Sequence, residues 1–170
     1  MKISSVILFS LLLVSCAGVP ESIKPVTDFD INKYMGKWYE IARLDHRFER
    51  GLEKVTATYS LNRDGSVRVE NRGFSTENKE WEDAVGKARF AGGKNTGHLK
   101  VSFFGPFYGS YVIFDLDKED YQYSFVTGSE NTLWFLSRTP EVSDELKNKF
   151  LSIVKDAGYN TEGLIFVNQK

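Results

Sequence analysis

The stretch Gly36-Lys37-Trp38-Tyr39-Glu40-Ile41-Ala42-Arg43 decides the fold of this chain. Much later, a second apolar segment runs from Trp134 to Pro140 and carries Arg138 near its end. An early Gly-x-Trp on one strand and a late arginine at the end of another are typical of a closed β-barrel. Its base is sealed by the tryptophan ring stacked under the guanidinium group. We therefore expect Gly36, Trp38 and Arg138 to be structural residues at the base of a barrel that forms a cup.

The rest of the folded part consists of short β-rich segments separated by turn signals, such as Asn62-Arg63-Asp64-Gly65. The pattern predicts an all-β protein with strands at 37–46, 55–61, 66–74, 80–90, 98–104, 108–116, 121–127 and 132–138. Strands that are neighbours in sequence are expected to be neighbours in space. An eight-stranded antiparallel up-and-down barrel is the simplest closure, because it leaves no long unpaired edge.

One segment near the C-terminal end departs from the period of two. Its apolar residues recur at helical spacing, at Leu146, Phe150, Ile153, Val154 and Ala157. Ser143 is a suitable N-cap, and Gly158 stands where a helix commonly ends. We expect one α-helix packed against the outside of the barrel, followed by a short ninth strand at 164–167.

The N-terminal residues predict a targeting segment. Lys2 precedes an apolar run over 6–14 that is too short for an ordinary transmembrane helix. The run ends in Leu13-Val14-Ser15-Cys16, which resembles a bacterial lipobox. We interpret residues 1–15 as a lipoprotein signal peptide, 16–28 as a lipid-anchored tether and 29–170 as the barrel domain. Lipidation of Cys16, the only cysteine, would leave no thiol for a disulfide, for catalysis or for a metal.

The charge balance and the motif content exclude several functions. With 22 basic and 23 acidic residues and no like-charge block, the chain has no footprint for nucleic acid. Asp45 and His46 are adjacent, so on a strand they point to opposite faces and cannot form a catalytic dyad. We predict no catalytic residue, no metal site and no cofactor. The acidic turn over 115–120 leaves a loose cation site open as an alternative to a solvated turn.

The motifs together resemble the lipocalins, most closely the bacterial outer-membrane lipocalins that are similar to apolipoprotein D and to plant temperature-induced lipocalins. The resemblance covers residues 29–169 and rests on the stretches 36–43, 48–52, 55–61, 100–107 and 134–140. The second family motif, usually Thr-Asp-Tyr, departs here and reads Leu116-Asp117-Lys118. The resemblance implies binding of fatty acids or lysophospholipids, no known catalytic residues, and a homodimer as one possible arrangement. It also implies three acyl chains on Cys16, which would anchor the protein firmly in a membrane.

The same resemblance implies a location. Ala17 follows the lipidated cysteine where an aspartate would signal retention in the inner membrane of enteric bacteria. We therefore expect the outer membrane of a Gram-negative bacterium, on its periplasmic face.

Strand alternation from the two anchor residues gives a list of side chains expected inside the cup. The predicted ligand-binding residues are Tyr59, Val69, Asn71, Val101, Phe103, Tyr111, Trp134 and Leu136. If Trp38 points inward, Glu40, Ala42 and Leu44 do so too, unless a bulge intervenes. A buried Glu40 without a partner would be costly, and it would reach Arg43 only through a bulge or at the barrel rim.

Two alternatives to a lipid-binding cup remain open. One is an envelope enzyme, an esterase or isomerase acting on a small hydrophobic substrate, and the other is a structural barrel filled by its own side chains. The aromatic segment 103–108, together with Phe48, is expected at the mouth. The sequence does not decide whether it serves as a lid, a membrane contact or a dimer interface.

Overall fold

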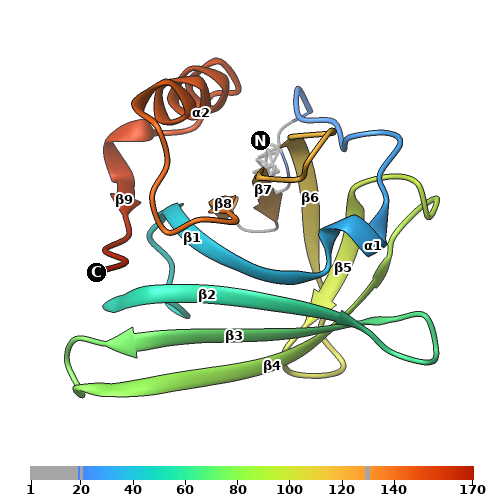
Figure 1. The fold of residues 1–170 in the computed structure, drawn as a ribbon, viewed down its shortest axis with the longest axis horizontal. Coiled ribbons are helices and arrows are strands. Elements are labelled where there is room, and N and C mark those ends of the chain that lie inside the picture. Colours follow the sequence, from blue (N-terminus) through green and yellow to red (C-terminus); the bar gives the residue numbers. More distant parts are fainter. Residues whose placement is uncertain (1–18, 20, 129–130) are drawn as a thin grey trace, which may run out of the picture.

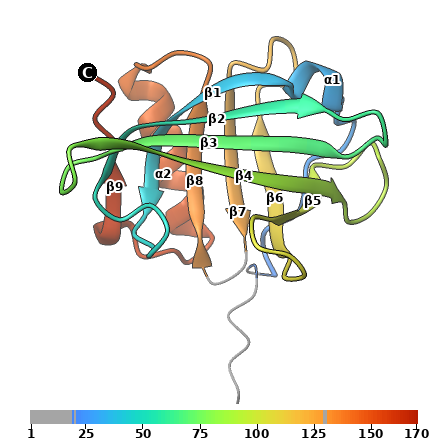
Figure 2. The ribbon, with the colours of Figure 1, turned by 90° about the horizontal axis from the view of Figure 1, so that it is seen from below.

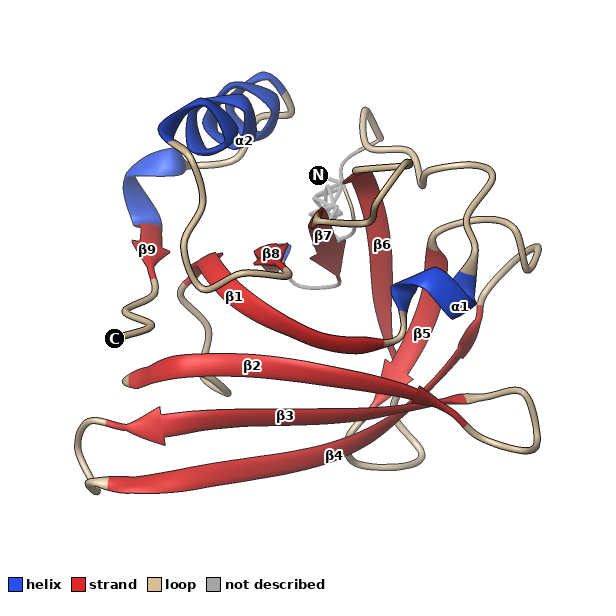
Figure 3. Ribbon diagram, viewed as in Figure 1, coloured by secondary structure: helices blue, strands red, loops and turns tan. Residues whose placement is uncertain are grey.

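A computed structural model describes residues 19, 21–128 and 131–170; the predicted signal peptide and Cys16 lie outside this range. The chain is mostly strands, with helices only at the periphery (Figure 3). In order the elements are α1 (Ile31–Tyr34), β1 (Gly36–Leu44), β2 (Leu52–Leu61), β3 (Val67–Ser75), β4 (Glu80–Phe90), β5 (His98–Ser102), β6 (Gly109–Leu116), β7 (Tyr123–Gly128), β8 (Leu133–Ser137), α2 (Asp144–Asp156), the 3₁₀ turn η2 (Thr161–Gly163) and β9 (Leu164–Phe166).

The strands form one antiparallel sheet that closes on itself. Their order is β2-β3-β4-β5-β6-β7-β8-β1-β9, and an additional pairing of β1 with β2 completes the barrel. Figure 2 shows the long strands β2, β3 and β4 running across β6, β7 and β8. The predicted eight-stranded up-and-down barrel is confirmed.

The helix α2 covers the outside of the barrel (Figure 1). Its start is capped as expected, because the Ser143 hydroxyl accepts a hydrogen bond from the Leu146 N–H. Its buried face places Phe150 against Phe125 and Phe135 of the wall, with ring centroids 4.9 and 5.1 Å apart. The predicted external helix is confirmed.

A bulge in β1 reverses the direction of its side chains. The register of β1 against β8 shifts between Glu40 and Ala42. An extra residue moves every later side chain to the other face. Ala42 and Leu44, predicted to face the cup, instead belong to the outer cluster beneath α2, so this prediction is wrong. Arg43 takes the inward place that alternation had given to Ala42.

The segment before the barrel is packed and not a free tether over its whole length. Ile23 is buried in the outer cluster, and Val26 is held by backbone hydrogen bonds to Gly97 and Ile113. The interpretation of 16–28 as a tether is therefore wrong from Ile23 onward, since apolar side chains there find the barrel wall.

The short helix α1, which the sequence analysis missed, covers one end of the barrel. The Asp30 carboxylate caps it by accepting from the Asn32 N–H. Tyr34 is fully buried, and its backbone carbonyl accepts a hydrogen bond from the Trp38 indole N–H at 2.8 Å. This helix makes the end of the barrel near Trp38 the closed one.

The seam between β1 and β2 is closed in two different ways. Near the closed end the strands pair directly, over residues 36–39 of β1. Beyond the bulge they separate, and β9 pairs with β1 instead. The Gln169 side-chain amide then donates to the backbone carbonyls of both Glu40 and Val55, at 2.7 and 2.9 Å. A side chain thus replaces strand pairing along the upper seam.

Candidate ligand-binding site

The predicted lining residues share the lumen side of the wall. Seven belong to the inner apolar cluster or pack against it: Tyr59, Val69, Val101, Phe103, Tyr111, Trp134 and Leu136. Asn71 lies two residues from Val69 on β3, between Ala57 and Ala84 of the neighbouring strands. Its side-chain oxygen is buried and has no hydrogen-bond partner among the described residues. Contact of these side chains with a ligand stays a prediction.

The base of the lumen is built by the two anchor residues of the sequence. The Arg138 guanidinium lies 3.8 Å from the centroid of the fully buried Trp38 ring. Its N–H groups also donate to backbone carbonyls of Lys33, Lys37 and Tyr121. Gly36 has a φ of +95°, a conformation that L side chains rarely adopt. Arg138 thus links α1, β1 and the β6–β7 turn into a sealed end.

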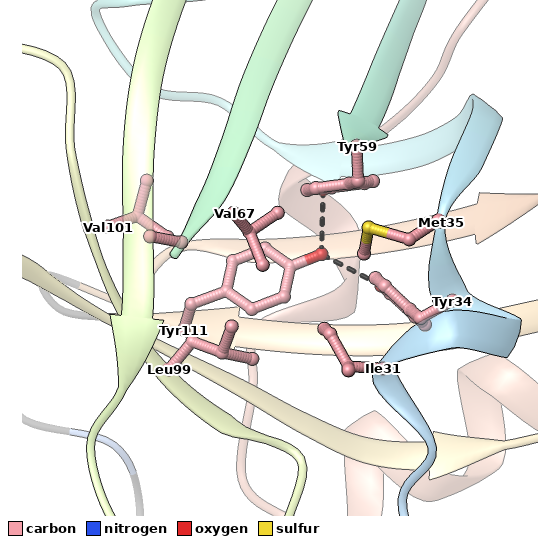
Figure 4. A pocket seen from close by; sticks show the side chains of 9 residues that line it. Ile31, Tyr34, Met35, Tyr59, Val67, Leu99, Val101 and Tyr111 are labelled. Carbon is pink, nitrogen blue, oxygen red and sulfur yellow. Dashed lines mark hydrogen bonds between the residues drawn. The ribbon is translucent and has the colours of Figure 1, made fainter. Parts of the chain in front are cut away.

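A layer of three tyrosines, Tyr34, Tyr59 and Tyr111, adjoins this base, with the Tyr34 ring centroid 4.8 Å from that of Trp38. Figure 4 shows the three rings together. The Tyr111 hydroxyl is 2.9 Å from those of both Tyr34 and Tyr59, and Tyr34 also contacts the Ser124 hydroxyl at 3.1 Å. Burial raises the pKa of Tyr34 to about 12, so the hydroxyls remain protonated. The pocket that they help to enclose measures only about 10 Å³. The lower part of the barrel is therefore filled by its own side chains.

The upper lumen carries a buried polar cluster. Because the β1 bulge turns Arg43 inward, its guanidinium donates to the Glu40 carboxyl at 2.7 Å and to the Glu49 backbone carbonyl at 2.7 Å. The Glu49 carboxylate accepts from the Trp134 indole N–H at 3.0 Å and lies 2.8 Å from His46 Nε2. The bulge that the sequence analysis named as a condition for the Glu40–Arg43 pair is present.

The two carboxyl groups of this cluster have opposite pKa shifts. Burial, with the neighbouring Glu49 charge, raises the pKa of Glu40 well above its ordinary value despite Arg43. Burial also acts to raise the pKa of Glu49, but His46, Trp134 and Arg43 outweigh it, so the pKa is lowered. Arg43 donates to the carboxyl group of Glu40 but only to the backbone carbonyl of Glu49, whose carboxylate contacts Trp134 and His46. Glu40 therefore keeps its proton to a higher pH than Glu49 does.

The barrel wall is incomplete at the end opposite Trp38, which is the predicted mouth. Ala84 shares the lumen-facing parity of Gly86 and Ala88 on β4, yet it is exposed, because β4 pairs with β5 only over 87–90. Two loops meet at this mouth through the stacked rings of Phe48 and Phe104, whose centroids lie 6.5 Å apart. Both rings remain more than half exposed.

A larger hollow of about 360 Å³ lies elsewhere. It is lined mainly by side chains of the outward parity, from Arg68, Val85, Lys87, Ser102 and the loop that reaches Tyr108. The hollow is thus a surface groove beside the mouth and not the cup.

Two carboxylates of the acidic turn over 115–120 make local contacts. Asp117 orders the β6–β7 turn by accepting from the backbone N–H groups of Glu119 and Gln122. Asp115 pairs with Lys149 at 2.8 Å. Within the described ranges, no three His, Cys, Asp or Glu side chains are grouped to hold a metal ion, and no helix is long and apolar enough to span a membrane.

Three residues of the site were missed from the sequence. Tyr34 comes from an unpredicted helix, while His46 and Glu49 belong to a segment read as strand end and loop. The spacing of apolar residues along the sequence does not indicate such residues, because each contributes to the site through specific polar contacts. The helix of Tyr34 had one usable signal, the cap residue Asp30.

Comparison with known proteins agrees with this architecture. The lipocalin-like domain family matches residues 29–169. Outer membrane lipoprotein Blc of Vibrio cholerae is 55% identical over 100% of both chains, and that of Escherichia coli strain K12 is 48% identical over 93% of this chain and 90% of its own. Insecticyanin from Manduca sexta superposes with a TM-score of 0.70 at 21% identity, covering 89% of this chain and 86% of its own. The chain belongs to the lipocalin family.

Proposed function

We propose that this protein binds fatty acids or lysophospholipids in its upper lumen. The observation that carries the proposal is a set of mostly apolar side chains that the strands direct into the lumen, next to a buried polar cluster. Each buried methylene of an acyl chain contributes about 0.8 kcal/mol, so about ten methylenes contribute about 8 kcal/mol before association costs are subtracted. Membership of the lipocalin family supports the same reading.

The test uses two substitutions that differ only in the face of β4 on which they lie. Ala84→Trp fills the lumen side of the mouth, whereas Val85→Trp places the same ring on the outer face. Calorimetric titration with a fatty acid and with a lysophospholipid should show binding for the native protein and for Val85→Trp, and none for Ala84→Trp. Equal loss in both variants, or no binding by the native protein, would contradict the proposal. Native mass spectrometry of protein purified without delipidation identifies the resident lipid.

We also propose that acylated Cys16 anchors the protein in the outer membrane of a Gram-negative bacterium, facing the periplasm. The lipobox-like Leu13-Val14-Ser15-Cys16 and the names of the two bacterial relatives support this location. In cell fractionation, Cys16→Ser should move the protein from the outer-membrane fraction to the soluble fraction. A Cys16→Ser protein that stays in the membrane fraction would overturn the anchor.

We also propose that the exposed aromatic rings at the mouth mediate association of two copies of this chain. Phe48, Phe104 and Phe107 are exposed by 59, 67 and 78%. A shared apolar surface of this kind is often buried when two copies associate. Analytical ultracentrifugation of the delipidated protein and of Phe107→Ser should give a smaller sedimentation coefficient for the variant. Identical monomeric behaviour would remove a homodimer from the proposal.

A further inference from the structure

The structure contains a crossbar of side chains that divides the lumen. Tyr59 extends from β2 and Tyr111 from β6, and their hydroxyls meet at 2.9 Å. In the sheet order, β2 and β6 are separated by three strands, so in a barrel of eight they stand on opposite walls. The two tyrosines therefore span the whole width of the lumen. Tyr34 joins them from the closed end, again at 2.9 Å (Figure 4).

The space beneath the crossbar cannot take an acyl chain. Its enclosed volume of about 10 Å³ approaches the room that one water requires. Side chains of Ile31, Met35 and Leu99 occupy the rest. Any chain that enters from the mouth has to end at the crossbar.

The crossbar presents an apolar surface to the mouth. The Tyr111 ring stacks with Trp134 at a centroid distance of 6.5 Å. Its hydroxyl is turned away, toward Tyr59 and Tyr34. A terminal methyl group would therefore meet the stacked rings of Tyr111 and Trp134, while the polar end of the ligand stays toward the mouth and water.

We propose that Tyr111 sets the length of acyl chain that this protein binds, by acting as the stop of its lumen. This proposal rests on the proposed lipid-binding function. Below the limiting length, each added methylene is buried and raises the affinity about fourfold. Beyond that length the added carbons remain outside, so the affinity no longer rises.

The experiment measures affinity for a series of saturated fatty acids of increasing length by calorimetry. The native protein should show a break, with an increase of about fourfold per methylene before it and none after it. Tyr111→Val removes the ring but keeps a good strand-forming residue. In this variant the fourfold increases should continue past the native break.

Two control variants separate ring volume from other effects. Tyr111→Phe loses both hydroxyl contacts but keeps the ring, so its break should stay at the native length. Leu99→Ala enlarges the space behind the crossbar and leaves the crossbar in place, so its break should not move either. A break that shifts equally in Tyr111→Phe and Tyr111→Val would show that the hydrogen bonds, and not the ring, set the limit.

The possible failures are distinguishable. No binding by the native protein at any length refutes the proposed function itself. Binding without a break, or a break that Tyr111→Val does not move, refutes the role of Tyr111 and leaves lipid binding intact. If Tyr111→Val does not fold, the native length series still decides, because affinity that rises steadily through the longest chains excludes a stop.

Discussion

Replacing Glu40 by glutamine should change the pH dependence of stability in a specific way. The raised pKa means that folded Glu40 holds its proton at pH values where the unfolded chain has released it. The native state then binds more protons, so its free energy of unfolding falls as pH rises from the unfolded value toward the folded one. The slope is about 1.4 kcal/mol for each pH unit per proton.

Glutamine keeps an acceptor oxygen for the Arg43 guanidinium, 2.7 Å away in the native protein, but carries no titrating proton. Glu40→Gln should match native stability in acid, below the unfolded pKa. It should become progressively more stable than the native protein at higher pH, by about 1.4 kcal/mol per pH unit until the folded pKa is passed. Urea denaturation of both proteins across this pH range gives the difference directly, because titrating groups outside this cluster contribute equally to both.

A matched variant in the same cluster should behave in the opposite way. The lowered pKa of Glu49 stabilises the folded state above the unfolded pKa, and this contribution is lost as pH falls. Glu49→Gln should therefore be less stable than the native protein at neutral pH, with the deficit disappearing in acid. If Glu40→Gln is instead destabilised at neutral pH, Glu40 is ionised and forms a true ion pair with Arg43, which refutes the assignment of the proton.

Three other substitutions test the base, the seam and the wall. Arg138→Ala should lower the free energy of unfolding by about 2–4 kcal/mol, because it removes the cation–π contact with Trp38 and three hydrogen bonds; a loss below about 1 kcal/mol in urea denaturation contradicts this. Gln169→Ala should cost about 1–3 kcal/mol and speed amide hydrogen exchange in the upper halves of β1 and β2, and unchanged exchange would show that the seam does not need the bridge. Asn71→Leu should raise the stability of delipidated protein by about 1–2 kcal/mol, because it removes a buried unpaired oxygen; a lower stability would count against that reason.

The barrel could be predicted because its strands carry clear alternation and turn signals. On β3 the charged Arg68, Glu70 and Arg72 fix the outward face, and Val67 and Val69 consequently lie in the core. In β1 the residues Glu40, Ile41, Ala42 and Arg43 are all buried. No alternation of buried and exposed positions therefore marks the bulge. Alternation alone therefore assigned Ala42 to the wrong face.

For the candidate site, the sequence predicted which side chains line the lumen but not how they contact one another. Parity placed Tyr59 and Tyr111 in the lumen, but their mutual contact joins residues 52 positions apart. Tyr34 reaches the same hydroxyl from 77 positions away. Such contacts depend on the closure of the barrel, on its width and on the seating of α1. None of these is encoded in a local period.

The bridge made by Gln169 has a consequence for the order of folding. Most strand pairs join sequence neighbours and can form as successive hairpins. The upper seam instead depends on two contacts of Gln169. One is with Glu40, 129 positions away, and the other is with Val55, 114 positions away. Closing such long loops is slow, because their entropy is lost before the contact is gained. The upper seam between β1 and β2 should therefore close last, and until then the side of the barrel stays open there.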